Sequence, residues 1–467
     1  MFIKQLYTGC LSEAAYYIES EGEAAIIDPL RDIDAYTTLA KEHKSSIKYI
    51  FETHFHADFV SGHIDLAKET GAPIIFGPGA VPEFDIHAAT DGEIFRLGKL
   101  SIEVIHTPGH TLESTCYLLR DEKNQPYAIF TGDTLFVGDV GRPDLSSGNM
   151  SSEELAGIMY DTVQEKILPL ADDIIVYPAH GAGSSCGKNL GPDTFSTIGE
   201  QKQTNYALQP QTKEDFITAL TTGLSKAPKY FAINAKINMQ GYSSLDNIKQ
   251  QGLCSLTVSE VKTMIQENVL LLDTRHASAF STGFIPGSIF IGLEGRFAEW
   301  AGSLLPFDQP IVLVTEPGKE EEAVVRLSRV GFDKMQGYLN GGFEAWKEAG
   351  ETVDIIIDVE ADELAMDLPH DPNMIVLDVR RETEFADGHV AGAQNIPLNN
   401  MPDVSLISRF EDNQNLYVHC AGGYRSVIAA SILKRQGIHN LRNVLGGWSK
   451  IKEEKSIKIE KEASMLN

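Results

Sequence analysis

The sequence predicts a multidomain α/β protein, and three observations support this prediction. The chain has 467 residues, enough for about three domains, and 42% of them are hydrophobic, so each domain can bury a core. From residue 1 to about 245, short apolar runs alternate with turns and a few helical stretches. The remaining chain repeats itself. We therefore expect one domain over residues 1–245 and two related domains over 256–355 and 358–460.

The composition limits the partners and the compartment. The net charge is -27 at pH 7, and such a surface repels nucleic acids and anionic membranes. No apolar run is long enough for a membrane span, and the first residues lack the apolar core of a signal peptide. Five widely spaced cysteines suit a reducing compartment better than a disulfide framework. We expect a cytoplasmic protein.

The first domain begins with simple apolar patterns. A strand is predicted over Ala24–Pro29, a helix over Asp34–His43, a buried strand over Ile47–Phe51 and a helix over Val60–Thr70. Within the first of these helices, three apolar or small residues share one face. Near the end of the domain, Thr212–Leu224 is predicted as a helix. The chain from Pro228 through the Asn- and Gln-rich stretch to Gln251 is predicted as the end of the domain and a linker.

Potential metal ligands follow the buried strand. His54, His56 and Asp58 lie within five positions of one another. Neutral imidazole is the commonest metal ligand in proteins, and a nearby carboxylate can bind the metal or orient the imidazole. Single polar residues at such places are usually ordinary loop residues. Three of them together make a metal site the better interpretation.

Three later strand ends repeat this arrangement. A strand over Leu100–Ile105 leads to His110, one over Tyr127–Phe130 to Asp133, and one over Ile174–Tyr177 to His180. Any one of these residues alone could simply form a turn. Their recurrence after successive strands strengthens the metal-site prediction.

The motif Thr-His-x-His-x-Asp and the later strand ends resemble the metallo-β-lactamase fold. This resemblance implies an αββα sandwich for the first domain. The usual motif continues with a histidine after the aspartate, whereas this chain has Phe59. Because phenylalanine cannot coordinate a metal, one ligand of a second metal is missing. A single-metal site is therefore favoured over a dinuclear hydrolytic centre.

The stretches Tyr177–His180, Thr131–Asp133 and Gly141–Asp144 resemble the persulfide dioxygenase branch of this fold. The resemblance implies one Fe(II) per chain, with open positions for O2 and a substrate sulfur. It assigns the ligands His54, His110 and Asp133. It gives His56, Asp58 and His180 a supporting role, in which they orient the ligands and order metal-bound water. They would be ligands only if a second metal bound.

Two residues near this site have open roles. By resemblance, Arg142 positions the anionic part of the substrate; the alternative is an internal salt bridge. The run Gly181–Lys188 resembles that of bacterial dioxygenase–rhodanese fusions and contains Cys186. This cysteine is either a redox-accessible thiol, favoured by a neighbouring lysine, or an inert small residue. The sequence does not identify the thiol carrier of the substrate.

The two repeat copies share signatures at both ends. Asp273 and Asp378 occupy matching places near their starts, and the copies close with Leu339–Trp346 and Val444–Trp448. These paired signatures resemble tandem rhodanese domains, which are α/β units around a parallel sheet.

The second copy carries a reactive cysteine. A strand over Leu416–His419 ends at Cys420, and a helix follows a Gly-rich loop that ends in Arg425. Backbone N–H groups and the helix N-terminus lower the pKa of such a thiol, so it can accept and pass on sulfane sulfur. A cysteine phosphatase loop has five residues between Cys and Arg, whereas this loop has four. The shorter loop suits a single sulfur or sulfite.

The first copy lacks this chemistry. The flanking signatures place Thr315 opposite Cys420 and Glu320 opposite Arg425; a slip of one residue places Glu316 and Glu321 there instead. Neither alignment supplies a sulfur carrier. This copy is predicted to be an inactive packing or spacing module.

The resemblances together imply an Fe(II) persulfide dioxygenase that uses O2 to oxidise a small thiol persulfide to sulfite. The sulfurtransferase part would form thiosulfate from sulfite, and the whole would detoxify sulfide. One alternative is a glyoxalase II-like zinc thioester hydrolase with accessory rhodanese domains. Another is a non-catalytic sulfur carrier or sensor with a structural metal. By analogy with the fold's relatives, we expect a homo-oligomer, either a dimer or a tetramer.

Overall fold

The computed structural model describes residues 1–145, 150–224, 226–411 and 413–462. The chain divides into two compact units. Unit 1 comprises Met1–Asn247 together with the short segment Leu327–Asp333. Unit 2 comprises Ile248–Arg326 and the chain from Lys334 onward.

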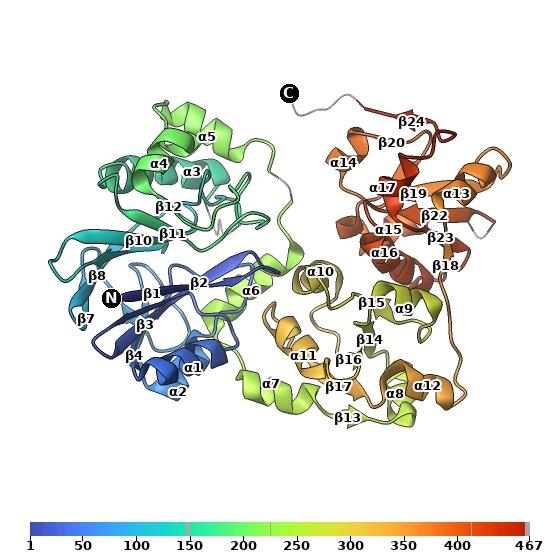
Figure 1. Ribbon diagram of the computed structural model, residues 1–467, viewed down its shortest axis with the longest axis horizontal. Coiled ribbons are helices and arrows are strands. Elements are labelled where there is room, and N and C mark those ends of the chain that lie inside the picture. Colours follow the sequence, from blue (N-terminus) through green and yellow to red (C-terminus); the bar gives the residue numbers. More distant parts are fainter. Residues whose placement is uncertain (146–149, 225, 412, 463–467) are drawn as a thin grey trace. The chain divides into compact units, whose positions relative to one another are not determined.

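Unit 1 contains two six-stranded sheets (Figure 1). The first has the order β1-β2-β3-β4-β5-β6 and comprises β1 (Phe2–Thr8), β2 (Glu13–Ser20), β3 (Glu23–Ile27), β4 (Ser46–Phe51), β5 (Ile74–Phe76) and β6 (His87–Ala88). The second has the order β12-β11-β10-β9-β8-β7 and comprises β7 (Ile94–Leu97), β8 (Leu100–His106), β9 (Thr115–Arg120), β10 (Pro126–Gly132), β11 (Ile175–Pro178) and β12 (Ser196–Thr197). Parallel pairs run from β3 to β6 and join β10 to β11; the other pairs are antiparallel.

Three apolar layers hold unit 1 together. The inner faces of the sheets share one core, which includes Ile27, Phe51, Tyr117 and Phe130. Helices α1 (Asp34–His43) and α2 (His63–Thr70) pack on the outer face of the first sheet. Helices α3 (Ser152–Thr162) and α5 (Lys213–Thr221) pack on that of the second. This arrangement is the expected αββα sandwich.

The remaining helical segments of unit 1 lie in its second half. They are the π-helical turn η1 (Val163–Ile167), α4 (Ile198–Thr204), η2 (Tyr206–Leu208), α6 (Lys229–Gln240) and the start of α7 (Leu245–Gly252). The first unit's main stretch does end within residues 228–251, at Asn247, but most of these residues form helices rather than a linker. The prediction for α1 is confirmed. Helix α2 begins at His63 rather than Val60, because Leu30 and Ser61 form a β-bridge that keeps the preceding residues extended.

Unit 2 contains two parallel five-stranded sheets and a small two-stranded antiparallel sheet. The first sheet has the order β13-β17-β16-β14-β15 and comprises β13 (Ser255–Leu256), β14 (Leu270–Asp273), β15 (Ile289–Phe290), β16 (Ile311–Val314) and β17 (Met335–Leu339). The second has the order β18-β23-β22-β19-β21 and comprises β18 (Ile357–Val359), β19 (Met374–Asp378), β21 (Gln394–Asn395), β22 (Asn415–His419) and β23 (Leu441–Val444). Strand β20 (His389–Val390) pairs antiparallel with β24 (Ile459–Glu460).

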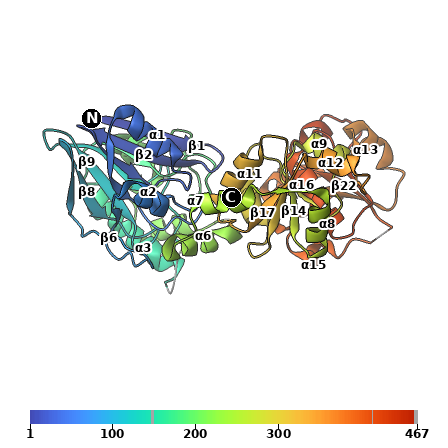
Figure 2. The ribbon, with the colours of Figure 1, turned by 90° about the horizontal axis from the view of Figure 1, so that it is seen from below.

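Short helices flank both sheets of unit 2 (Figure 2). Those of the first copy are α8 (Val258–Gln266), α9 (Ala277–Thr282), α10 (Phe297–Leu304), α11 (Glu320–Ser328) and α12 (Gly342–Glu348). Those of the second are α13 (Ala361–Asp367), α14 (Glu382–Ala386), η3 (Leu398–Asn400), α15 (Val404–Ile407), α16 (Tyr424–Arg435) and α17 (Gly447–Ile451). The matching sheet orders confirm the internal repeat as two rhodanese-like domains with parallel sheets.

Strand pairing decides between the two alignments of the copies. Asp273 pairs with Val314, as Asp378 pairs with His419. The next residues, Thr315 and Cys420, are therefore equivalent. The alignment without a slip is the correct one.

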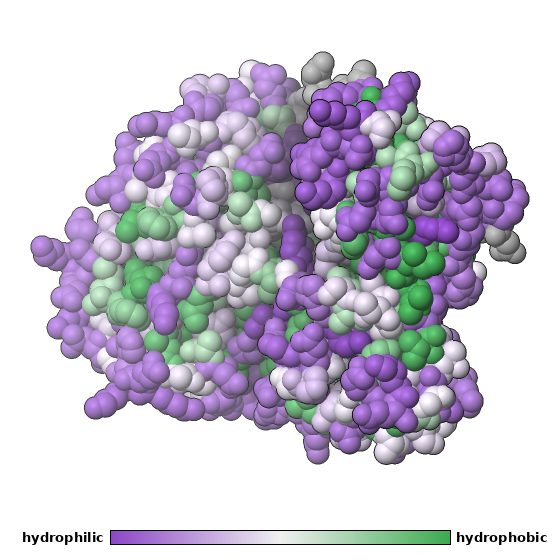
Figure 3. All heavy atoms as spheres, turned by 45° about the vertical axis from the view of Figure 1, so that its right-hand side comes forward, coloured by the Kyte–Doolittle hydropathy of each residue, from purple (hydrophilic) through white to green (hydrophobic). Residues whose placement is uncertain are grey.

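Hydrophilic residues dominate the face of the molecule shown in Figure 3, as the charge of -27 leads one to expect. Within the described residues, no helix is both long enough and apolar enough to cross a bilayer.

Candidate functional site

The three predicted metal ligands meet at the ends of β4, β8 and β10. The Nε2 atoms of His54 and His110 lie 3.8 and 3.4 Å from Oδ2 of Asp133. The three side chains are buried, and one potential ligand atom from each lies within 4.8 Å of the others. The strand ends thus bring together two imidazoles and one carboxylate, as a facial metal site requires.

Neighbouring groups determine the tautomers of both histidines. Nδ1 of His110 lies 2.7 Å from the carbonyl oxygen of Arg142, so Nδ1 carries the proton. Nδ1 of His54 lies 3.0 Å from Oγ1 of Thr53, whose own proton goes to Asp28. The Nε2 lone pairs of both histidines therefore face Asp133 and are available to a metal.

The charge state of the group also suits a cation. Both carboxylate oxygens of Asp133 are buried and have no hydrogen-bond partner among the described residues. Burial lowers the pKa of His54 well below its usual value, and the charges of neighbouring histidines lower it further. A neutral imidazole beside an unsatisfied carboxylate is a set of donors that a divalent metal would complete.

A second group of potential ligands lies beside the first and consists of His56, Asp58 and His180. Nε2 of His180 is 3.5 Å from both Asp58 and Asp133, while its Nδ1 donates to the carbonyl oxygen of Ser12. Asp133 thus lies between the two groups. Burial raises the pKa of Asp58, and the charges of His180 and His56 oppose that shift.

His56 is oriented mainly toward carboxylates. Its Nε2 lies 3.1 Å from Asp28 and 3.5 Å from Glu52. Burial would lower the pKa of His56, but Asp28 and Glu52 raise it well above the usual value. The ring of Phe59 packs on the same imidazole at 4.3 Å. These contacts involve Nε2 of His56 and its ring face, while its buried Nδ1 has no hydrogen-bond partner among the described residues.

The structure shows the surroundings of Arg142 and Cys186. The guanidinium of Arg142 is buried and forms a two-bond ion pair with Asp144, at 2.9 and 2.7 Å. It thus makes an internal salt bridge, and the carbonyl of the same residue orients His110. Burial raises the pKa of Cys186, and the Lys188 ammonium donates to the carbonyls of residues 219 and 222. These contacts favour the inert interpretation of Cys186, and a substrate-positioning role for Arg142 stays a prediction.

One residue of the site was missed by the sequence reasoning. Asn238 of α6 is buried; its Nδ2 donates to the carbonyls of His56 and Phe59, and its Oδ1 accepts from the N–H of Ser61. It thereby holds the loop that carries the first ligand motif. The signal was weak, because a single asparagine in a polar stretch 182 positions from His56 has no local pattern.

The second candidate site surrounds Cys420 in unit 2. The thiol is buried, and the N–H of Gly423 donates to its sulfur at 3.1 Å. Arg425 lies in the first turn of α16 and donates two hydrogen bonds to Glu384. The loop thus directs the N–H of Gly423, which precedes α16, at the sulfur, while the carboxylate of Glu384 holds the arginine.

The closing signature of each copy supports this loop. Gly447 has a φ of +51°, and a Cβ there would lie 2.3 Å from the carbonyl oxygen of Cys420. In the first copy Gly342 has a φ of +59°, and its Cβ would lie 2.9 Å from the carbonyl oxygen of Thr315. Only glycine fits these approaches. The first copy therefore retains the backbone of the loop although it lacks the cysteine.

These features define a class: a metal-binding αββα sandwich joined to two rhodanese-like domains, one of which has a cysteine loop. Family profiles agree. The profile of the metallo-beta-lactamase superfamily matches residues 8–180, and that of the rhodanese-like domain matches residues 257–349 and 360–454.

Individual relatives support the same assignment. A crystal structure of a metallo-beta-lactamase from Staphylococcus aureus subsp. aureus COL is 36% identical, with a TM-score of 0.63, and the match covers 73% of this chain and 98% of that one. The chain belongs to the metallo-beta-lactamase superfamily, fused to tandem rhodanese-like domains.

Two curated relatives differ in activity. The mitochondrial persulfide dioxygenase ETHE1 of Homo sapiens is 31% identical over 188 residues, which span 40% of this chain and 66% of that protein. A probable hydroxyacylglutathione hydrolase of Schizosaccharomyces pombe is also 31% identical, over 180 residues that span 38% and 66%. The chain thus spans about two thirds of the length of these relatives, and identity alone does not separate the two activities.

Proposed function

We propose that the chain is a non-haem Fe(II) persulfide dioxygenase joined to a sulfurtransferase. The first reaction consumes a small thiol persulfide, O2 and water, and it releases the thiol, sulfite and two protons. In the second, the Cys420 thiolate takes the outer sulfur of a persulfide and releases the thiol. Its own persulfide then passes that sulfur to sulfite, so thiosulfate forms and the thiolate returns.

The observation that carries the proposal is one site of two imidazoles and one carboxylate on the same chain as a rhodanese cysteine loop. Iron held by His54, His110 and Asp133 supplies the activation of O2 beside a bound sulfur. The residues of the chain prepare this site. The carbonyl of Arg142 and the hydroxyl of Thr53 keep both imidazoles in the binding tautomer.

The coupling of two sites on one chain also supports the proposal. Sulfite, the product of the first reaction, is an acceptor for the second. At Cys420, the N–H of Gly423 stabilises negative charge on sulfur, which favours both the thiolate and the terminal persulfide anion. We further propose a cytoplasmic homo-oligomer.

Oxygen uptake by the iron-loaded chain tests the proposal. We expect uptake with glutathione or coenzyme A persulfide, with sulfite and thiosulfate as products by mass spectrometry. Asp133→Asn should abolish uptake but keep sulfur transfer from thiosulfate. Cys420→Ser should keep uptake and shift the product from thiosulfate toward sulfite. Absence of uptake with every persulfide tried would end the proposal, and an unchanged product ratio would remove Cys420 from it.

A second candidate is a zinc thioester hydrolase of the glyoxalase II type. It is favoured by the group His56, Asp58 and His180, which adjoins Asp133 as a second metal site would. Against it, residue 59 offers no ligand atom and His56 faces Asp28 and Glu52. Metal analysis separates the two: one iron per chain supports the dioxygenase, whereas two zinc ions with turnover of S-lactoylglutathione support the hydrolase.

A further inference from the structure

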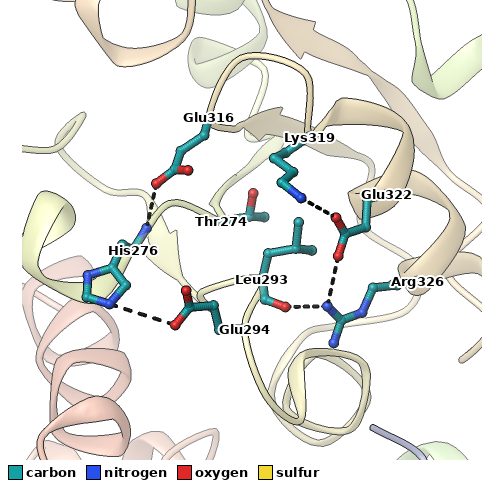
Figure 4. A pocket seen from close by; sticks show the side chains of 8 residues that line it. All are labelled: Thr274, His276, Leu293, Glu294, Glu316, Lys319, Glu322 and Arg326. Atoms are coloured by element: carbon teal, nitrogen blue, oxygen red, sulfur yellow. Dashed lines mark hydrogen bonds and ion pairs between the residues drawn. The ribbon is translucent and has the colours of Figure 1, made fainter. Parts of the chain in front are cut away.

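The first rhodanese-like copy contains a cavity of about 200 Å³ at the carboxyl ends of its strands (Figure 4). Thr274 follows β14 and Glu316 lies two residues after β16, and both line the cavity. Their counterparts in the other copy are Val379 and Ala421, which follow the strands beside Cys420. The cavity therefore occupies the place of the sulfur-binding cradle in the active copy.

The lining of this cavity carries excess negative charge. Lys319 and Arg326 both pair with one carboxylate, that of Glu322, at 2.9 and 3.3 Å. Among the described residues, neither Glu294 nor Glu316 forms an ion pair with a lysine or an arginine. The Glu316 carboxylate accepts from the backbone N–H of His276 at 3.4 Å, and the Glu294 carboxylate lies 3.7 Å from Nε2 of His276 (Figure 4). At the equivalent place in the second copy, Arg425 is paired with the carboxylate of Glu384.

A buried hydroxyl lacks a partner in the same cavity. Thr274 is 3% exposed, and its Oγ1 has no hydrogen-bond partner among the described residues. The backbone of Thr274 is satisfied, because its N–H donates to Val314 and its carbonyl accepts from Leu293. An unpartnered buried hydroxyl is unfavourable unless a bound molecule completes its hydrogen bonds. In Figure 4, Thr274 lies at the centre of the lining residues.

We propose that this cavity binds the ammonium group of a small primary amine. The carboxylates of Glu316 and Glu294 face the positive charge, and Oγ1 of Thr274 accepts one ammonium N–H. The cavity has room for a molecule of a few carbon atoms. We assign the amine to the thiol carrier, an assignment that rests on the proposed function. An aminothiol fits this site, whereas the carboxylates repel the phosphates of coenzyme A.

The cavity adjoins the active loop. Tyr424, the first residue of α16 after the Cys420 loop, donates its hydroxyl to the carbonyl of Gly292 at 2.7 Å. Gly292 lies two positions before Glu294, which lines the cavity. The ring of Tyr424 also packs edge-on against Phe290 of β15. An amine bound in the first copy would therefore lie next to Tyr424, the residue that anchors the Cys420 loop.

Isothermal titration calorimetry with two matched probes tests the site on the full chain. S-methylcysteamine carries an ammonium group, and 3-(methylthio)propionate carries a carboxylate on a similar frame. We expect one equivalent of the amine to bind and the carboxylate not to bind. Glu316→Gln should weaken the amine at least tenfold. Glu344→Gln, an exposed glutamate paired with Lys347 in the same copy, should leave it unchanged. Equal affinity in wild type and Glu316→Gln, or no binding by wild type, would overturn the proposal.

Thr274→Val separates a ligand contact from a structural role. Valine has the shape of threonine without the hydroxyl. Because that hydroxyl has no partner, we expect the melting temperature to stay the same or rise while amine affinity falls severalfold. A lower melting temperature with unchanged affinity would show that the hydroxyl serves the fold instead.

The probe contains no sulfane sulfur, so its binding is independent of oxygen uptake. A chain that takes up oxygen with persulfides but does not bind the amine contradicts this inference alone. A chain that binds the amine without oxygen uptake contradicts the dioxygenase and leaves the amine site standing.

Discussion

For a candidate histidine ligand, the contacts of its ring nitrogens determine whether Nε2 is free to bind a metal. The carbonyl of Arg142 gives His110 a free Nε2, and Thr53 does the same for His54. Asp28 and Glu52 instead draw His56 toward its protonated form. His54 and His110 thus present a free Nε2, whereas Nε2 of His56 faces two carboxylates, so the contacts of the ring nitrogens distinguish His56 from the other two histidines.

The pair of Arg425 and Glu384 predicts a pH effect. Hydrogen bonds from Arg425 lower the pKa of Glu384 below its usual value of 4.5. A carboxylate with a lower pKa in the folded state adds stability above its unfolded pKa, and that stability is lost as pH falls through the folded value. Both groups are partly exposed, so we expect a contribution of at most about 1 kcal/mol.

Urea unfolding between pH 5 and pH 3 measures this contribution. Glu384→Gln should make the free energy of unfolding fall less steeply with decreasing pH than in the wild type. Glu344→Gln, at an exposed pair, is the control and should follow the wild-type curve. Identical curves for all three proteins would contradict the prediction.

Among the elements, those with apolar patterns were predictable and α6 was not. Each ligand-bearing strand is a short apolar run that stops before the ligand, so strand and ligand could be read together. Helix α6 has Asn234 and Asn238 on its buried face, and the polar stretch was therefore interpreted as a linker. Its place depends on hydrogen bonds to a loop about 180 positions away, which no local pattern reveals.

Asn238→Ala tests whether α6 stabilises the loop that carries the first ligand motif. The substitution leaves two buried carbonyls and the N–H of Ser61 without their partner, so we expect a loss of about 2–4 kcal/mol in unfolding free energy. We also expect faster loss of metal to a chelator. Asn234→Ala is the matched control, because the side-chain polar atoms of Asn234 have no hydrogen-bond partner among the described residues. Equal effects of the two substitutions would refute this role.

The contact between α16 and the first rhodanese-like copy leads to another prediction. Tyr424 begins α16 directly after Gly423, whose N–H donates to the Cys420 sulfur. Tyr424→Phe keeps the ring but removes the hydrogen bond to Gly292, so we expect Gly423 to hold the thiolate less well. The pH midpoint of Cys420 alkylation should rise, and sulfur transfer should fall about threefold to tenfold, roughly 0.7–1.4 kcal/mol.

A matched variant makes this prediction specific. Tyr417→Phe removes a hydroxyl that donates to Asp367 in the same copy, away from the loop. It should leave the alkylation midpoint unchanged, and neither variant should change oxygen uptake. A midpoint unaltered by Tyr424→Phe would show that the hydroxyl does not position the loop.

For the whole molecule, unit 1 is built from two separate stretches of chain. Arg31 is fully buried and forms two hydrogen bonds with Asp333, at 2.6 and 2.8 Å. Arg329 likewise donates twice to Asp32, and its carbonyl accepts from the N–H of Val60, just after Phe59. The segment Leu327–Asp333 therefore supports the loop that carries the ligand motif. Domain boundaries taken from sequence signatures did not include this segment, because the pairing is distant in sequence.

Loss of one partner of the buried pair should be costly. Asp333→Ala leaves the guanidinium of Arg31 buried without a counter-charge, so we expect a loss of about 3 kcal/mol in unfolding free energy, measured by urea titration. Asp172→Ala, in an exposed pair with Lys202, should cost less than about 1 kcal/mol. A comparable loss in both variants would contradict the distinction.

Because unit 1 consists of two separate stretches of chain, its composition affects which fragments of such a fusion are stable. A fragment that stops at residue 247 would carry both sheets and every candidate metal ligand, yet its Arg31 would lack Asp333. Such a fragment is therefore expected to be less stable than the full chain, because a few residues of the first rhodanese-like copy belong to unit 1. That copy lacks the cysteine of the second, yet part of it completes the unit that carries the metal ligands.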